Sequence, residues 1–199
     1  DYELAKIEKR TISKVELLQT IHNKQNRTTF NRGNSILRKW EIIIFHSNDA
    51  QSASWDYQLF WLSWSGYTHT AMVLDDYYAI EAYPWRFSSK REITDILSQD
   101  NLSQYDKVII KRFSLSDREW RSMNWYTNKF LLNKPYPNKY DIILNTHKKD
   151  SLLALYCSQI PWLAYRATKG WDIDSDGGYI VYPVDILNTS YGESYALVD

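Results

Sequence analysis

The chain has 199 residues, of which 44% are apolar, and its 24 basic residues balance its 24 acidic ones. This composition is typical of one globular domain, and the balanced charge gives no electrostatic reason to expect a nucleic acid or an anionic membrane as partner. No apolar run reaches the roughly 20 residues that a membrane-spanning helix needs, and a single cysteine excludes an internal disulfide and a multi-cysteine zinc site.

The elements predicted for the first half of the chain follow from hydrophobic periodicity. Residues 2–24 have apolar positions at helical spacing and predict an amphipathic helix. A β-rich run at 40–45 predicts a strand, and the aromatic-rich segment 54–64 is expected to be helical. Residues 67–83 predict a hairpin, because two runs rich in Thr, Val, Ile, Tyr and Ala flank an Asp-Asp pair, which is a turn signal.

The second half of the chain adds strands and helices without a regular alternation. Residues 105–113 predict a strand, and residues 178–186 predict a last strand. A helix is expected over 116–132, because it opens with a Ser and a Glu at capping-box spacing. Another helix is expected after Cys157. This order favours an α+β fold, with an antiparallel sheet packed against helices.

The only cysteine, Cys157, lies at a predicted helix N-terminus. Because a helix tolerates Pro161 only in its first turn, the helix that ends near Gly170 should begin near Cys157 or Ser158. Unpaired backbone N–H groups and the helix dipole then favour a thiolate and can stabilise an oxyanion. A buried, inert cysteine is the alternative, since four apolar residues, 152–155, come shortly before it.

His69 and Glu81 fall on the two strands of the predicted hairpin. A three-residue loop would place them directly opposite each other, with Cβ atoms roughly 5 Å apart on one face, and a two-residue loop would set them one step off. In the opposed case the carboxylate can orient the imidazole, fix its tautomer and stabilise its charged form. A solvent-facing pair is the alternative, although the apolar neighbours of Glu81 favour a buried carboxylate that needs a partner.

Six short motifs follow one another in a recognisable order. They are Trp40-Glu41 before a β run, Tyr67-Thr68-His69, Ile80-Glu81-Ala82, Asn133-Lys134-Pro135-Tyr136, Tyr156-Cys157-Ser158-Gln159 and Tyr182-Pro183-Val184-Asp185. This order resembles the circularly permuted papain-like cysteine amidases, the YiiX-like branch of the NlpC cell-wall peptidase superfamily. The resemblance covers residues 40–186. Trp40-Glu41 stands where that branch has Gly-Asp, and Asn133 where it has Gly, so the departures concern the substrate rim.

The resemblance implies a permuted papain-like domain over 40–199, preceded by an N-terminal helical extension over 1–39. It implies Cys157 as nucleophile, His69 as general base and later acid, and Glu81 as the residue that orients His69. The implied reaction is attack on an amide carbonyl, a thioester intermediate and hydrolysis by water, with no cofactor required. The implied substrate is a short peptide, such as one derived from bacterial peptidoglycan, in the cell envelope or outside the cell, with the cytoplasm left open.

Two other classes of function compete with this interpretation. A thiol acyltransferase or lipid hydrolase of the lecithin:retinol acyltransferase type shares the permuted arrangement, and a membrane-anchoring apolar segment would favour it. A non-catalytic binding module could use the nine Trp and sixteen Tyr residues to stack on sugars. That module would need no ordered triad.

A second candidate site is the string formed by Asp172, Asp174, Asp176 and Gly177. Its D-x-D-x-D-G pattern matches the opening of an EF-hand loop, in which alternate carboxylates bind calcium. The twelfth position is Pro183 rather than Glu, so the bidentate ligand is missing. An ordinary surface turn is therefore the alternative to a calcium site.

Overall fold

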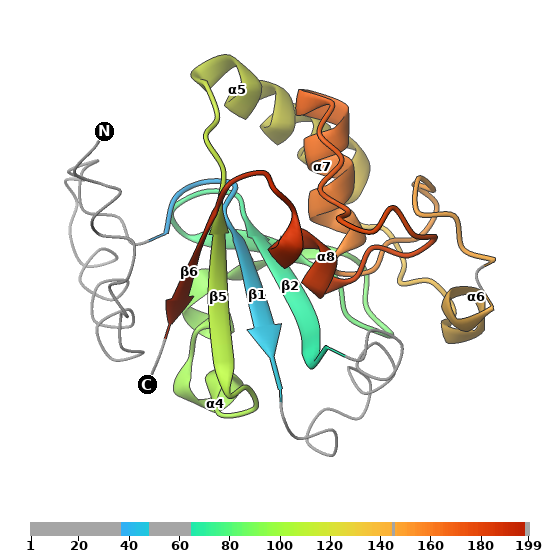
Figure 1. Cartoon of the computed structure of the whole chain (residues 1–199), viewed down its shortest axis with the longest axis horizontal. Coiled ribbons are helices and arrows are strands. Elements are labelled where there is room, and N and C mark those ends of the chain that lie inside the picture. The colour runs from blue at the N-terminus through green and yellow to red at the C-terminus, as the bar shows by residue number, and fades with distance from the viewer. Residues whose placement is uncertain (1–36, 48–64, 145, 198–199) are drawn as a thin grey trace.

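Six antiparallel strands form one sheet in the order β4-β3-β2-β1-β5-β6. The computed structural model describes residues 37–47, 65–144 and 146–197. The strands are β1 (Ile42–His46), β2 (Tyr67–Val73), β3 (Tyr78–Glu81), β4 (Ser89–Glu92), β5 (Lys107–Arg112) and β6 (Glu193–Leu197). Figure 1 shows the central strands running side by side below α5 and α7.

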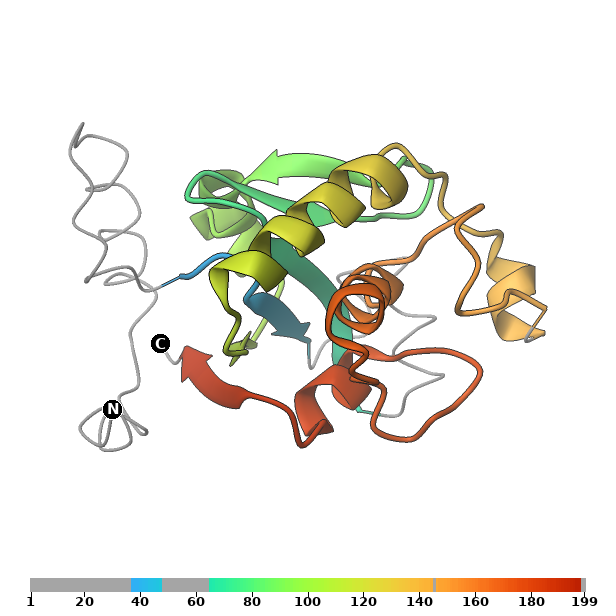
Figure 2. The same ribbon diagram turned by 90° about the horizontal axis from the view of Figure 1, so that it is seen from above.

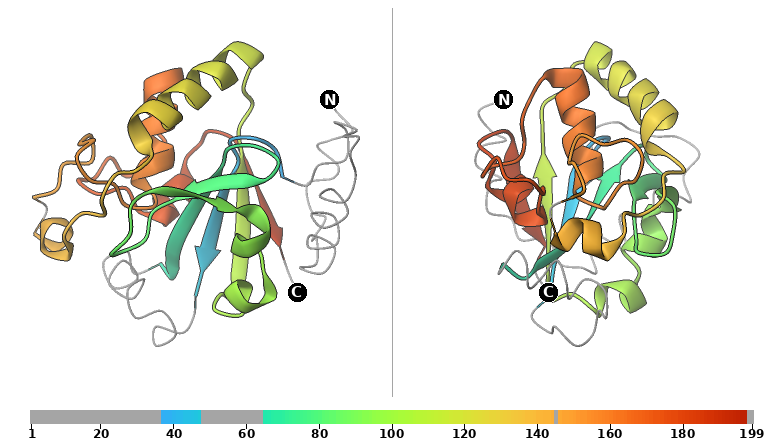
Figure 3. Two further views of the ribbon diagram at one scale, coloured as in Figure 1. Left: turned by 180° about the vertical axis from the view of Figure 1, so that it is seen from behind. Right: turned by 90° about the vertical axis from the view of Figure 1, so that its right-hand side faces the viewer.

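Helices cover both faces of the sheet. The short helices α3 (Ile93–Ile96) and α4 (Gln99–Leu102) pack on one face, whereas α7 (Gln159–Lys169) and α8 (Pro183–Asn188) pack on the other (Figure 3). Helix α5 (Asp117–Tyr126), continued by the π-helical turn η2 (Thr127–Leu131), lies beside α7 (Figure 2). Helix α6 (Lys139–Ile143) belongs to the connection between η2 and α7.

The buried strand β1 explains why the sheet has two apolar faces. Successive side chains of a strand point to opposite faces, so Ile42 and Ile44 join the hydrophobic cluster on the α7 side. Ile43 and Phe45 join the cluster on the α3 and α4 side, and all four side chains are fully buried. A continuous apolar run is therefore the expected sequence pattern for this central strand.

Most of the predicted elements are confirmed. The predicted strands at 40–45 and 105–113 and the predicted hairpin contain β1, β5 and the β2–β3 pair. Ser116 and Glu119 form the predicted capping box at the start of α5, and Gly170 ends α7 in the left-handed conformation, with φ of 69°. The predicted helices at 2–24 and 54–64 lie outside the described residues, as does most of the N-terminal extension at 1–39.

The predicted strand over 178–186 is wrong. Residues 183–188 form helix α8, and the last strand is β6, further along the chain. The helix begins here because Pro183 occupies its first turn, where a missing N–H costs nothing. The Asp185 carboxylate also accepts a hydrogen bond from the backbone N–H of Tyr182 at 2.7 Å, which caps the helix.

None of the helices in the described ranges is both long and apolar enough to cross a membrane.

Candidate active site

Cys157 lies at the start of α7, as the sequence predicts. It directly precedes Ser158, the N-cap residue of the helix, and only 2% of its surface is exposed. Pro161 falls in the first turn, where backbone N–H groups have no intrahelical partner. The Ser158 hydroxyl donates a hydrogen bond to the carbonyl of Val181 at 2.6 Å, which ties the helix start to the chain before α8.

A buried glutamine organises the segment that leads into the cysteine. The Gln159 side-chain amide donates hydrogen bonds to the carbonyls of Lys149 and Ser151, both at 2.9 Å. Its carbonyl oxygen accepts one from the backbone N–H of Tyr156 at 3.3 Å and lies 3.0 Å from Nε2 of His147. Sequence reasoning missed this role, although a polar residue directly before the apolar run 160–165 was the available signal.

His69 and Glu81 form a buried pair next to the thiol. The Nε2 atom of His69 lies 3.0 Å from Oε2 of Glu81, and their side chains are 1% and 3% exposed. The other carboxylate oxygen of Glu81 accepts a hydrogen bond from Nη1 of Arg91 at 3.1 Å. The Cys157 thiol lies within interaction range of His69 and contributes to raising the pKa of this imidazole. The structure therefore brings together the three residues predicted for the site.

Aromatic rings hold the imidazole of His69 in place. The Tyr83 ring stacks on it with centroids 4.3 Å apart, and the Phe45 ring lies 5.6 Å away at a tilt of 32°. Such rings restrict the rotation of the imidazole about its side-chain bonds. Together with the bond to Glu81, they define one orientation for the ring beside the Cys157 thiol.

The surroundings favour the charged form of the imidazole. Burial alone would lower the pKa of His69, but interactions with Tyr83, the Cys157 thiol and the Glu81 carboxylate raise this pKa well above its ordinary value. The phenol of Tyr83 contributes a charge only when it is ionised, so at neutral pH the Glu81 carboxylate is the charged partner that favours the imidazolium. Burial would likewise raise the pKa of Glu81, yet His69 and then Arg91 lower it overall.

The pairing of His69 with Glu81 differs in register from the expectation of direct opposition. Strand β2 pairs with β3 through Met72 with Ile80 and Val73 with Ala79, which sets Glu81 two positions away from His69. The connection between the two strands has four residues, 74–77, rather than three, and the Asp75 carboxylate accepts backbone hydrogen bonds from Tyr77 and Tyr78 at this turn. A shift of two positions keeps both side chains on one face, so the predicted contact forms diagonally.

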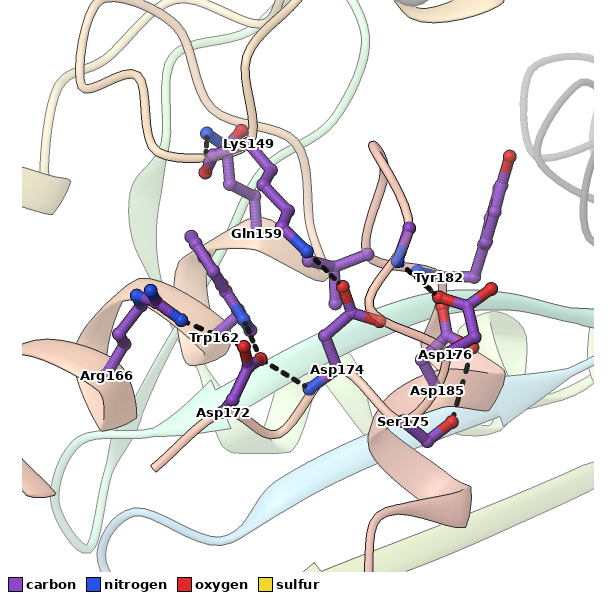
Figure 4. A network of polar contacts seen from close by, with 12 residues as sticks. Lys149, Gln159, Trp162, Arg166, Asp172, Asp174, Ser175, Asp176, Tyr182 and Asp185 are labelled. Atoms are coloured by element: carbon purple, nitrogen blue, oxygen red, sulfur yellow. Dashed lines mark hydrogen bonds and ion pairs between the residues drawn. The ribbon is translucent and has the colours of Figure 1, made fainter. Parts of the chain in front are cut away.

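The predicted calcium ligands are only partly brought together. Asp172 turns to α7, where it accepts hydrogen bonds from Nε1 of Trp162 and from Arg166, both at 2.8 Å. Asp174 and Asp176 instead lie with Asp185, which sequence reasoning missed, and carboxylate oxygens of these three residues lie within 4.8 Å of one another. Figure 4 shows the two arrangements on either side of Asp174.

The acidic cluster formed by Asp174, Asp176 and Asp185 is short of positive charge. Lys149 contacts Oδ2 of Asp174 at 2.5 Å, but the buried Oδ1 atom has no hydrogen-bond partner within the described part of the chain. Burial raises the pKa of Asp185 to about 6, and the neighbouring carboxylates add to this rise although the backbone N–H of Tyr182 opposes it. An orphaned carboxylate oxygen beside two further carboxylates fits a metal ion.

The chain is similar to an uncharacterized protein in sequence and to a metalloprotein in fold. No family model matches it. It is similar to the uncharacterized protein YycO of Bacillus subtilis (strain 168), with 28% identity over 114 residues. These residues make up 53% of this chain and 44% of YycO, so the match spans less than half of that relative's length.

Among solved structures, the fold is similar to that of YiiX from Escherichia coli O157:H7, which is described as a metalloprotein and assigned to DUF1105. The TM-score is 0.57 with 15% sequence identity, and the match covers 81% of this chain and 97% of YiiX. This likeness shows the fold. The chain has a YiiX-like α+β fold, with a six-stranded antiparallel sheet packed against helices.

Proposed function

We propose that the chain is a cysteine hydrolase that cleaves an amide bond in a short peptide through a thioester intermediate. One observation carries the proposal. The only thiol of the chain lies at a helix N-terminus and interacts with a buried histidine, whose Nε2 atom lies 3.0 Å from a buried carboxylate. A nucleophile, a base and an orienting group brought together are the arrangement that covalent acyl transfer needs.

The acylation half of the reaction follows from the roles of these three residues. With Nε2 of His69 facing Glu81, Nδ1 is the nitrogen that can accept the thiol proton. The sulfur of Cys157 attacks the amide carbonyl carbon, and the carbonyl π electrons move to the oxygen. The backbone N–H of Cys157 is the natural first donor to this oxyanion. When the oxyanion collapses, the C–N bond breaks and His69 gives its proton to the departing amine.

The deacylation half returns the enzyme to its starting state. His69 removes a proton from water, and the resulting hydroxide attacks the thioester carbonyl. The C–S bond breaks, the acid product leaves, and Cys157 recovers its proton from His69. Glu81 stays ionised throughout, because its lowered pKa favours the carboxylate, and it stabilises the imidazolium in both halves. Each step uses these residues and water. The description as a metalloprotein is that of YiiX, and the proposed mechanism does not draw on it.

The proposed substrate class rests on the resemblance to the NlpC superfamily. A peptide derived from bacterial peptidoglycan is the proposed substrate, and the protein would then act in the bacterial envelope or outside the cell. A thiol acyltransferase would use the same acylation step but pass the acyl group to an acceptor other than water. A sugar-binding module is disfavoured, because it does not require a thiol, an imidazole and a carboxylate in one buried contact.

The test is a substrate panel with matched variants of the whole chain. We expect hydrolysis of at least one muropeptide, with products identified by mass spectrometry, and loss of this activity in Cys157→Ala and His69→Ala. The control is His46→Gln, because His46 lies on the neighbouring strand β1 but pairs with Asp106 at 2.8 Å. Circular dichroism verifies the fold of each variant. Turnover by a folded Cys157→Ala variant would refute the proposal, and cleavage of phosphatidylcholine alone would favour the lipid alternative.

A further inference from the structure

The geometry points to a calcium site formed by Asp174, Asp176 and Asp185, which fastens the chain before α8 to the start of the nucleophile helix. This inference is independent of the hydrolytic activity, because it concerns residues outside the contact among Cys157, His69 and Glu81. The site is not an EF-hand loop. It joins two residues of the loop after α7 to one residue of α8 and leaves out Asp172.

The three carboxylates of the cluster carry more negative charge than their ion-pair partner Lys149 neutralises in the described ranges. Three carboxylates offer oxygens within 4.8 Å of one another, and two of these residues are buried. The Nζ atom of Lys149 lies 2.5 Å from Oδ2 of Asp174. Arg166, the next cation in the same network, forms an ion pair with Asp172 instead (Figure 4). Carboxylates at this spacing repel one another strongly in a partly buried site. A divalent cation at their centre converts the repulsion into attraction.

One carboxylate oxygen of the cluster is buried without a hydrogen-bond partner in the described ranges, and this observation is independent of the clustering. The Asp174 side chain is fully buried, and its Oδ1 atom has no hydrogen-bond partner in the described ranges. Figure 4 shows one oxygen of Asp174 at Lys149 and the other on the side of Asp176 and Asp185. A buried charged oxygen without a partner is costly. A cation bound by all three carboxylates would satisfy it.

The ligand set and its dimensions select the ion. Carboxylate oxygens alone favour a hard cation over zinc or copper. Ca²⁺ accepts six to eight oxygen ligands at about 2.3 to 2.6 Å in a flexible geometry, whereas Mg²⁺ demands a near-ideal octahedron at about 2.0 to 2.1 Å. Three carboxylate oxygens spread over as much as 4.8 Å therefore suit the larger and less demanding ion, which is calcium.

The site is connected to the cysteine through Val181. The backbone N–H of Val181 donates to the Tyr156 hydroxyl at 3.0 Å, and its carbonyl accepts from the Ser158 hydroxyl at 2.6 Å. Tyr156 and Ser158 are the two neighbours of Cys157 in the chain. A cation that joins Asp176 to Asp185 would therefore stabilise the segment that flanks the thiol on both sides.

The experiment compares two aspartates of the same string in the whole chain, after removal of metals with a chelator. Isothermal titration with CaCl₂ and thermal unfolding are measured for wild type, Asp176→Asn and Asp172→Asn. Asp176 is exposed, and an Asn there can still accept the hydrogen bond that Gly178 donates to Oδ1 at 2.8 Å. In wild type we expect binding of one calcium. At a calcium concentration about 100 times Kd, linkage predicts a rise in Tm of roughly 5 to 10 °C.

The variants distinguish a metal site from a structural cluster. Asp176→Asn should weaken calcium binding by about 10-fold or more, since one of three charged ligands is lost, without lowering Tm in the calcium-free protein. Asp172→Asn should bind calcium as wild type does. The inference is overturned if wild type shows neither heat nor a Tm shift, if Asp172→Asn loses binding as Asp176→Asn does, or if Asp176→Asn lowers Tm equally with and without calcium. A larger Tm rise with MgCl₂ would overturn the assignment to calcium.

Discussion

Replacing Glu81 by glutamine tests how the proposed thiolate–imidazolium pair is maintained. The carboxylate accepts hydrogen bonds from both His69 and Arg91, but a glutamine has only one oxygen. Arg91 can only donate, so it holds that oxygen and turns the amide NH₂ toward His69. Two donors then face each other whenever Nε2 carries a proton, and the charged imidazole loses its partner.

The magnitude follows from the loss of one charge-assisted hydrogen bond. Such a bond contributes about 1.5 to 3 kcal/mol, which corresponds to a roughly 10- to 150-fold smaller thiolate–imidazolium population. Alkylation of Cys157 by iodoacetamide reports this population, because the thiolate is the nucleophile and the chain contains no other thiol. We expect Glu81→Gln to label at pH 7 about 10- to 150-fold more slowly than wild type, as followed by intact mass spectrometry.

A second substitution identifies the cause of the slower labelling. In Glu81→Gln combined with Arg91→Leu, the amide can turn its oxygen to His69, so labelling should recover by about 10-fold or more relative to Glu81→Gln alone. Arg91→Leu by itself should have a small effect, because this arginine is 31% exposed and water weakens its contribution. Wild-type labelling rates in Glu81→Gln, or no recovery in the double variant, would refute the reasoning.

Two further predictions concern stability. Because the pKa of Glu81 is lowered in the folded chain, its ionised form stabilises the fold above the unfolded pKa near 4.3, and this contribution disappears as pH falls through the folded value. The difference in Tm between wild type and Glu81→Gln should therefore narrow from pH 7 to pH 3, and a constant difference would contradict this sign. Ser116→Ala removes the capping box of α5 and should lower the free energy of unfolding by about 1 kcal/mol. Thermal unfolding should then show a Tm roughly 2 to 4 °C lower, and an unchanged Tm would show that the cap does not stabilise the fold.

The three site residues could be predicted because each depends on local rules. Pro161 and Gly170 bound a helix from both ends, which places Cys157 at its start. Neither register considered for His69 and Glu81, directly opposed or one step off, is the one observed, but the observed offset of two positions equals the period of a strand. Both side chains therefore stay on the same face, and the contact survives the error.

Other features could not be predicted, because tertiary contacts determine them. The acidic cluster includes Asp185 only because α8 folds back against the loop after α7, and a linear motif cannot show this. The edge strand β4 has the polar sequence Ser-Lys-Arg-Glu, and β6 (Glu-Ser-Tyr-Ala-Leu) begins with two polar residues, so neither has the continuous apolar run of β1. Each of them pairs on one side only, so neither needs that pattern.

The most direct test of the central claim is the labelling of native Cys157 across pH 5 to 9. A thiolate stabilised by His69 and by the N-terminus of α7 should react with iodoacetamide at pH 6 at least about 10-fold faster than the same thiol in the unfolded chain. His69→Ala should remove this excess, while His46→Gln should retain it. If Cys157 in the folded chain labels only after denaturation, the active thiolate is absent and the hydrolase proposal is contradicted.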